Sequence, residues 1–198
     1  MIPKQGWINL YKPKNITSFK AINFIKKNFL IKKIGHAGTL DPMAEGILPI
    51  AIGKATKLIP YINIMKKEYE FTITWGSQTT TDDSQGKIIF ESNYFPTKTE
   101  IEKKINSYLG YINQIPPKVS AVKINGQRAY KLFRENEKFT IEPKKVFIEK
   151  LNITEHNTHK TSFKILCGKG FYVRSFARDF ALDLKTYGHI SSLKRSKV

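Results

Sequence analysis

Residues 35–49 read Gly-His-Ala-Gly-Thr-Leu-Asp-Pro-Met-Ala-Glu-Gly-Ile-Leu-Pro, a stretch with three glycines and two prolines. Glycines punctuate it, and Pro42 biases the preceding Asp41 away from helical conformation, so we expect a loop. A carboxylate held in a short loop between glycines and a proline is exposed and rigid, which suits a nucleophile or a general base. The alternative is an ordinary Asp-Pro turn, because aspartate is common at turns for local hydrogen-bonding reasons.

The chain carries a large excess of positive charge. Its 198 residues include 34 lysines and arginines against 16 aspartates and glutamates, which gives a formal net charge of +18. Such an excess is typical of proteins that bind a polyanion, so RNA or DNA is the expected partner. The alternative is a coding bias toward lysine, since a uniformly cationic surface can also serve solubility alone.

Several kinds of protein and site are disfavoured. No apolar run approaches the roughly 20 residues that cross a bilayer, so we expect a cytoplasmic protein without a membrane partner. Cys167 is the single cysteine, and no group of cysteines and histidines has metal-ligand spacing. The sequence has no glycine-rich phosphate loop, no Gly-x-Ser-x-Gly elbow and no dinucleotide fingerprint. We therefore expect neither a metal nor a cofactor.

The pattern of apolar residues predicts strands and helices in irregular alternation. A helix is expected to begin near Thr17 or Ser18, with Phe19, Ile22, Ile25 and Phe29 on its buried side. Alternation over residues 68–75 predicts a strand whose apolar face begins with Tyr69. The fold class that follows is α+β, with a mixed, largely antiparallel sheet flanked by helices.

The second half of the chain adds three features. Thr97 and Glu100 form a capping box before a predicted helix. Residues 117–144 predict a projecting basic insert with a turn at Asn125-Gly126. A helix from Val173 follows, with Arg174 and Arg178 off its apolar stripe and one turn apart. Residues 189–198 are expected to form an edge strand.

Residues 35–49 resemble the signature of the TruB-type tRNA pseudouridine(55) synthases. Other motifs of that family have matches in the same order along nearly the whole chain: Lys67-Glu68-Tyr69 with Gly76, an acidic loop over residues 79–86, Lys169-Gly170-Phe171-Tyr172-Val173-Arg174-Ser175, and Leu193-Lys194-Arg195. The resemblance implies a sheet with a deep central cleft, and the isomerisation of uridine to pseudouridine in the T-arm of tRNA.

The same resemblance implies a role for individual residues. The catalytic set would be Asp41 as nucleophile, Tyr69 stacked on the target uracil, and Arg174 paired with Asp41. His36 would fill the space that the base leaves in the RNA loop, and Asp83 would support Arg174. The base pocket would include Tyr172 and Leu193, and Lys12 and Lys67 complete the expected substrate-binding residues. The insert at 117–144 would be a thumb that closes over RNA.

The sequence departs from the family pattern in places. Tyr11 stands where the family usually has Asp or Asn, and Thr80 stands where the acidic loop commonly has its first Asp. Many members carry a C-terminal RNA-binding PUA domain, which residues 1–198 do not include. The expected protein is a monomeric tRNA-modifying isomerase. Two alternatives remain open, an RNA-binding folding helper and the catalytic subunit of a guide-RNA particle.

Overall fold

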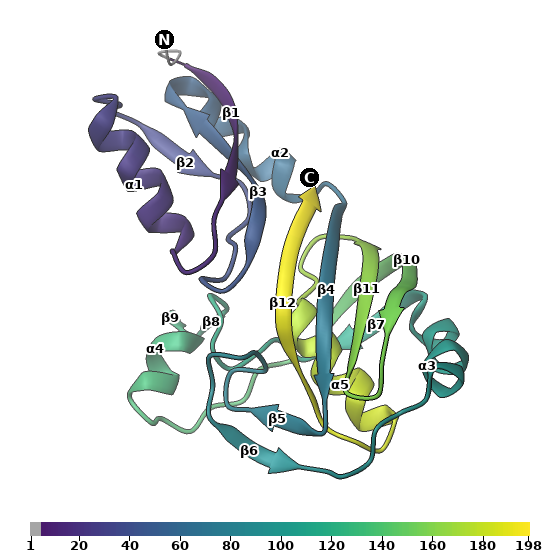
Figure 1. Ribbon diagram of the computed structural model, residues 1–198. Helices are drawn as coiled ribbons and strands as arrows, with labels where there is room; N and C mark the ends of the chain where they lie inside the picture. Colours follow the sequence, from purple (N-terminus) through teal and green to yellow (C-terminus); the bar gives the residue numbers. More distant parts are fainter. Residues whose placement is uncertain (1–4) are drawn as a thin grey trace. The chain divides into compact units, whose positions relative to one another are not determined.

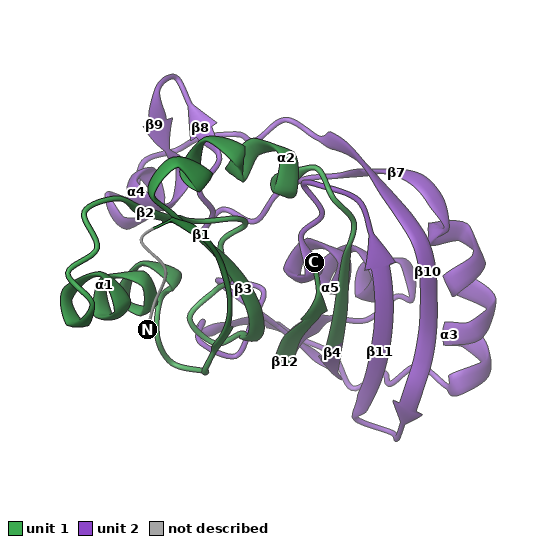
Figure 2. Cartoon of the chain, turned by 90° about the horizontal axis from the view of Figure 1, so that it is seen from above, with its two compact units in different colours: residues 1–70, 192–198 green, residues 71–191 purple. Residues whose placement is uncertain are grey.

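The computed structural model describes residues 5–198, in which strands and helices alternate irregularly (Figure 1). The chain divides into two compact units, shown in different colours in Figure 2. Unit 1 contains the residues up to Glu70 together with Ser192–Val198, and unit 2 contains Phe71–Ser191. Strands β4 (Lys67–Trp75) and β12 (Gly188–Lys197) contribute residues to both units.

Unit 1 is organised around strand β3 (Glu45–Ile52). Strand β1 (Gly6–Lys12) pairs with one side of β3 in antiparallel register. The short strand β2 (Ile34–His36) pairs in antiparallel register with the C-terminal end of β3. Strand β12 pairs in parallel with the N-terminal end of β3, through Lys194 with Glu45 and Arg195 with Gly46. A 3₁₀ turn, η1 (Gly53–Leu58), and helix α2 (Ile59–Asn63) follow β3.

Helix α1 (Ser18–Asn28) begins where the sequence predicts, because the Thr17 side chain caps it by accepting a hydrogen bond from the Lys20 N–H. Its predicted buried side was wrong in part. Ile22 and Ile25 pack against the core of unit 1, but Phe19 and Phe29 are 66% and 52% exposed. The buried residues of α1 are at positions 18, 21, 22 and 25, which form one stripe along the helix. Position 19 lies about 100° around the helix from position 18 and so falls outside this stripe.

Unit 2 contains a sheet with the strand order β12-β4-β11-β10-β7. Its remaining strands are β7 (Gly110–Gln114), β10 (Lys144–His156) and β11 (Lys160–Cys167). The unit also contains helices α3 (Lys98–Ile105) and α5 (Val173–Asp183). Helix α3 begins at the predicted Thr97–Glu100 capping box. Aromatic side chains join α5 to the sheet. The ring centroid of Phe176 on α5 lies 5.7 Å from that of Phe71 and 6.3 Å from that of Phe163. Helix α5 therefore covers one face of the sheet (Figure 1).

Smaller elements lie between these strands. A turn, η2 (Asn106–Tyr108), precedes β7, and β5 (Ser77–Thr79) pairs with β6 (Ile88–Glu91). The insert contains β8 (Lys123–Ile124), β9 (Gln127–Arg128) and α4 (Ala129–Arg134). The predicted turn joins β8 to β9, with Asn125 and Gly126 at φ 47° and 86°, as a type I′ hairpin requires.

The mixed, largely antiparallel α+β fold expected from the sequence is confirmed, since β12 with β3 is a parallel pair among antiparallel ones. The expectation that residues 189–198 form an edge strand was wrong. In unit 1, β12 has β3 on one side and β4 on the other. Leu193 and Arg195 are accordingly buried, whereas an edge strand would present more of its length to solvent. The central cleft stays a prediction.

Candidate active site

Three buried side chains of unit 1 donate hydrogen bonds to the backbone of the loop that carries Asp41. Backbone carbonyl oxygens of Gly38, Leu40 and Pro42 accept hydrogen bonds from Arg195 Nη2 at 3.0 Å, Ser18 Oγ at 3.0 Å and Lys12 Nζ at 3.4 Å, respectively. These three side chains are 1%, 2% and 0% exposed. Because the bonds lie on both sides of Asp41, which is itself half-buried, the backbone of this residue is fixed.

Lys12 is buried without its ammonium group being left unsatisfied. Its Nζ also donates to the carbonyl oxygens of Pro13 and Ile16, each at 2.8 Å. Burial lowers the pKa of Lys12, while the charges of Asp41 and Glu45 oppose that shift. The family resemblance suggested Lys12 as a substrate-binding residue, but its ammonium group donates to three carbonyl groups of its own unit, which points to a structural role.

His36 lies at the end of β2, opposite Ile50 of β3. Burial lowers the pKa of its imidazole, and the nearby positive charge of Arg195 lowers the pKa further. The ring is therefore neutral at pH 7. Its Nδ1 is buried without a hydrogen-bond partner, which leaves one polar atom of a predicted substrate-binding residue unsatisfied.

The remaining predicted residues of unit 1 lie on β4 and β12. Tyr69 is buried and begins the alternating face of β4, as the sequence predicts. Leu193 is buried on β12. The Lys67 ammonium donates to the carbonyl oxygens of Asn63 and Met65 at 3.1 and 2.8 Å, so it satisfies the last carbonyls of α2 and its loop.

Arg174 is the centre of a buried polar network in unit 2. Its guanidinium donates to the carbonyl oxygens of Thr81 and Val119, both at 3.0 Å. Its Nε lies 3.8 Å from Asp83 Oδ2, the contact that the family resemblance implies. Asp83 is in turn fixed by the Thr81 hydroxyl and the Gln85 N–H, at 2.6 and 2.9 Å from its Oδ1. The guanidinium direction is thus set by the acidic loop.

Arg178, which the sequence places one turn after Arg174, forms an ion pair with the aspartate that precedes Asp83. Arg178 Nη1 lies 3.2 Å from Asp82 Oδ2, and its Nη2 donates to the Ile115 carbonyl at 2.8 Å. Burial raises the pKa of Asp82 even though the positive charge of Arg178 lowers it. The spacing of four residues between the two arginines, beside two adjacent aspartates, was the available sequence signal for this ion pair.

Gln114 is a residue that the sequence did not single out. Its buried side-chain amide donates to the Tyr172 carbonyl at 3.0 Å and accepts from the Tyr172 N–H at 2.8 Å. Tyr172 is the residue that precedes α5, so this reciprocal pair fixes the backbone from which Arg174 starts. A lone glutamine in a strand gives no sequence pattern that could have revealed this.

Tyr11 and Thr80, the two residues that depart from the family pattern, each form a hydrogen bond within their own unit. The Tyr11 hydroxyl donates to Glu45 Oε2 at 2.9 Å, and Lys14 Nζ lies 3.3 Å from the other oxygen of Glu45. The backbone of Thr80 pairs with that of Lys87, and its hydroxyl accepts the Lys87 N–H, so it closes the acidic loop rather than contacting Arg174.

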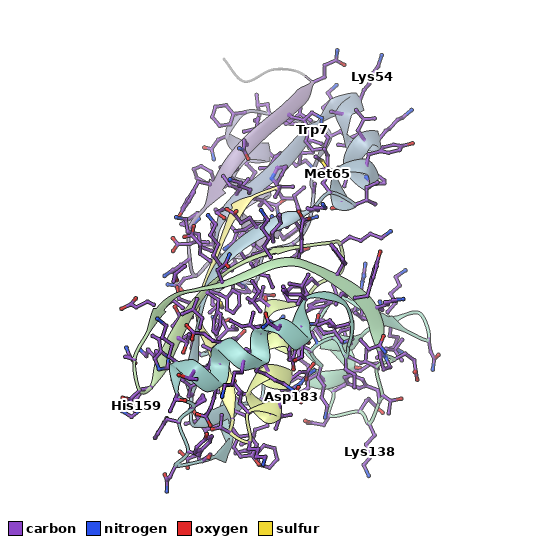
Figure 3. The ribbon with its side chains drawn as sticks, turned by 90° about the vertical axis from the view of Figure 1, so that its right-hand side faces the viewer. Trp7, Lys54, Met65, Lys138, His159 and Asp183 are labelled. Carbon is purple, nitrogen blue, oxygen red and sulfur yellow. The ribbon has the colours of Figure 1, made fainter. Side chains whose placement is uncertain are left out.

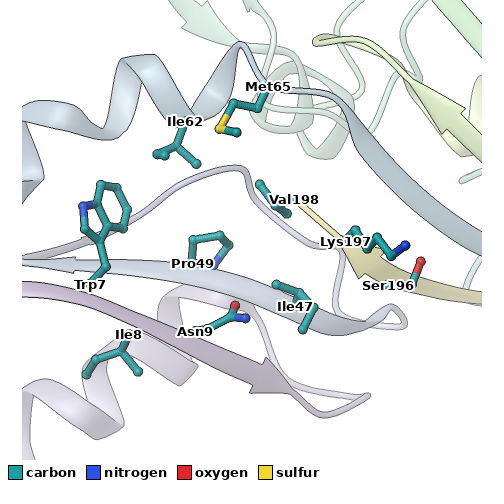
Figure 4. A pocket seen from close by; sticks show the side chains of 10 residues that line it. All are labelled: Trp7, Ile8, Asn9, Ile47, Pro49, Ile62, Met65, Ser196, Lys197 and Val198. Carbon is teal, nitrogen blue, oxygen red and sulfur yellow. The ribbon is translucent and has the colours of Figure 1, made fainter.

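A hollow of about 440 Å³ lies elsewhere in unit 1 (Figure 4). Its walls are largely apolar and come from β1, β3, the α2 segment and the end of β12; they include Trp7, Pro49, Ile62, Met65 and Val198. Trp7 and Met65 are also labelled in Figure 3. None of the predicted site residues lines this hollow, so it is not the predicted base pocket.

The structure thus organises two sets of predicted residues, each within its own unit. Unit 1 holds Asp41, Tyr69, His36 and Leu193, and unit 2 holds Arg174, Asp83 and Tyr172. The pairing of Arg174 with Asp41 stays a prediction.

Comparison with known sequences bears directly on these motifs. The model of a family described as "TruB family pseudouridylate synthase (N terminal domain)" matches residues 26–173. The chain belongs to the TruB family. The matched range contains Asp41, Tyr69 and Asp83 and ends one residue before Arg174.

Individual TruB relatives are similar over almost the whole chain. Proteins named tRNA pseudouridine synthase B are 50% identical in Wolbachia pipientis subsp. Culex pipiens and 46% identical in Ehrlichia chaffeensis, each over 98% of this chain. The chain spans 55% and 66% of their lengths. A solved structure described as a Cbf5-Nop10-Gar1 complex contains a chain with a TM-score of 0.76 and 26% identity, covering 98% of this chain and 49% of that one.

In the part of the chain that the structure describes, no helix is long and apolar enough to span a membrane.

Proposed function

We propose that this protein isomerises uridine to pseudouridine in the T-arm of tRNA, at position 55, with Asp41 as the nucleophile. One observation carries the proposal: Asp41 lies in a loop with the TruB signature, and buried donors fix backbone carbonyls on both sides of it. The proposal draws further support from relatives that are 46–50% identical and are named tRNA pseudouridine synthase B.

The chemistry needs one carboxylate and no bound group. Isomerisation breaks the bond between uracil N1 and the ribose C1′, turns the base, and forms a bond between C5 and C1′, while C5 loses a proton and N1 gains one. If Asp41 attacks the uracil ring, the base stays covalently bound to the protein while it turns; if Asp41 attacks C1′, the ribose is esterified to Asp41 and the detached uracil turns within the site. In either route the bond to Asp41 breaks by the time the C5–C1′ product is released. Both routes balance, and the residues of the loop serve either.

The target uridine is stacked in folded RNA, so it must be extruded before Asp41 can reach it. Extrusion costs about a few kcal/mol, which stacking of the base on Tyr69 partly offsets. His36 fills the vacated space in the RNA loop. We further propose Arg174 as the ion-pair partner of the Asp41 carboxylate, as the family resemblance implies.

RNA binding would come from the thumb-like insert at 117–144. Its exposed lysines and arginines are spread over α4 and the following loop, and Lys138 projects from it in Figure 3. Lysine contacts to phosphate position RNA without reading its sequence. We place the working protein in the cytoplasm as a monomer, with residues 1–198 as its catalytic domain.

The test uses the protein alone with an unmodified tRNA transcript, followed by an assay for pseudouridine. Wild type is expected to form pseudouridine, and Asp41→Asn is expected to bind tRNA with nearly unchanged affinity and form none. Equal product from both proteins would remove Asp41 from its role. Lack of product from both would reject the stand-alone enzyme and favour a folding helper or a subunit of a guide-RNA particle.

A further inference from the structure

Arg195 is an unusual buried cation. Arginine is almost never fully buried unless it is paired with an acid, yet Arg195 is buried on β12 and no carboxylate of the described residues forms a salt bridge with it. Its guanidinium instead donates from Nε to the carbonyl oxygen of Ile47 at 2.7 Å and from Nη2 to that of Gly38 at 3.0 Å. Two backbone acceptors therefore take the place of an ion pair.

Those two acceptors enclose the Asp41 loop. Gly38 lies three residues before Asp41 and Ile47 six residues after it, so one planar side chain connects the two ends of the loop. The backbones are also in close contact, because a Cβ at Gly46 would lie 2.2 Å from the Arg195 carbonyl oxygen. The fork of a guanidinium holds two donors at a fixed separation, which a lysine ammonium does not.

We propose that Arg195 is a positioning residue for Asp41, which acts by fixing the separation of the two loop ends and does not contact the uridine. The inference rests on the proposed function. A nucleophile must sit within a short distance of its target in the reactive orientation, and a displacement of about 1 Å can cost about 100-fold in rate. Loss of Arg195 should therefore slow the chemical step and leave tRNA binding intact.

Lys12 does not duplicate this role. It contacts the loop at Pro42 alone, and its two shorter hydrogen bonds go to Pro13 and Ile16, outside residues 35–49. Ser18 likewise contacts the single residue Leu40. Arg195 alone among these three connects the entry of the loop to its exit.

The experiment compares wild type with Arg195→Lys and Arg195→Ala, and uses Lys194→Gln as the matched control on the same strand. Lys194 is partly exposed, and its ammonium lies 3.8 Å from a Glu70 oxygen. For each protein we would measure kcat and KM for pseudouridine formation, the Kd for tRNA, and the folded fraction. Ethylguanidinium and ethylammonium would then be added separately to Arg195→Ala.

For Arg195→Lys we expect kcat per folded molecule to fall about 10- to 100-fold while KM and Kd stay within about 3-fold. Ethylguanidinium should restore part of the lost kcat of Arg195→Ala, ethylammonium should not, and Lys194→Gln should match wild type. A role limited to stability would change the folded fraction without this split between kcat and KM or this selective rescue.

Other outcomes overturn the inference. Wild-type kcat in Arg195→Lys, or a loss of activity that follows the folded fraction alone, assigns Arg195 to the stability of the fold. Failure of both variants to fold leads to the same conclusion. An inactive wild type would reject the proposed function itself, and that result is separate because the variants enter only after wild-type activity is established.

Discussion

The Ser18 hydroxyl makes two hydrogen bonds with the backbone of Leu40: it accepts from the N–H at 2.9 Å and donates to the carbonyl at 3.0 Å. Ser18 is the first residue of α1, and Leu40 immediately precedes Asp41. The start of a helix and the proposed nucleophile are thus connected through a single oxygen atom.

Ser18→Ala would leave both backbone groups of Leu40 without these partners. Because the site is buried, we expect the free energy of unfolding to fall by about 1–3 kcal/mol, with a lower kcat per folded molecule. Chemical denaturation and the pseudouridine assay measure the two effects. The control is Thr17→Ala, which removes the helix cap and should cost about 1 kcal/mol without changing kcat. Equal kcat in both variants would show that Ser18 does not act on the loop.

Gly46→Ala should be much more destabilising than an alanine at another glycine of positive φ. Gly46 has φ 112°, and its added Cβ would lie 2.2 Å from the Arg195 carbonyl oxygen. Gly110 has φ 87° but no atom within 4 Å of such a Cβ. Backbone strain alone should cost Gly110→Ala about 1–2 kcal/mol, and the clash should bring Gly46→Ala to about 3 kcal/mol or more. Similar unfolding energies for the two variants would contradict the close contact.

His36 should make stability depend on pH in the mildly acidic range. Its pKa is lowered in the folded state, so below about the unfolded value of 6.5 the unfolded chain binds more protons than the folded one. Stability is therefore full above that value and is lost as the pH falls through and below it. His36→Gln should remove this component of the slope. Denaturant unfolding at pH 5.5 and 7.5 provides the measurement, and an unchanged slope in the variant would refute the assignment.

Affinity for tRNA should fall steeply with salt, because each phosphate contact releases counterions. Lys131→Gln and Lys138→Gln, both at exposed positions of the insert, should each reduce the log–log slope by about 1. Lys98→Gln is the control, since Lys98 lies on α3 and faces Glu102 at 3.8 Å. Filter binding over a salt series tests this. If the control changes the slope as much as the insert variants do, RNA does not bind preferentially at the insert.

Local sequence patterns predicted the elements well where short-range chemistry determines them. The Thr17 cap, the Thr97–Glu100 box, the Asn125-Gly126 turn and the alternating face of β4 all depend on neighbours within a few residues. The error at α1 arose because Phe19 and Phe29 are large and apolar, and the stripe that packs begins instead with the small Ser18. The size and hydrophobicity of Phe19 and Phe29 indicated that they would be buried, but the start of the helix at the Thr17 cap determined that the face beginning with Ser18 packs against the core.

Motifs in the sequence were enough to name candidate site residues, but they did not reveal the side chains that hold those residues in place. Asp41 and Arg174 lie in motifs that resemble those of the family, and the contact of Arg174 with Asp83 is one that the resemblance implies. Gln114, Arg178 and the hydrogen bonds of Arg195 depend on contacts between distant parts of the chain. A single sequence contains no periodicity that reports such pairs.

Arg195 contacts Gly38 across 157 residues of chain. During synthesis on a ribosome, the segment around Asp41 emerges long before Arg195, whose side chain donates hydrogen bonds to both ends of the loop. The nascent chain consequently holds the Asp41 loop without this connection until Arg195 has been translated. The loop can therefore reach the geometry described above only after β12 has left the exit tunnel and paired with β3.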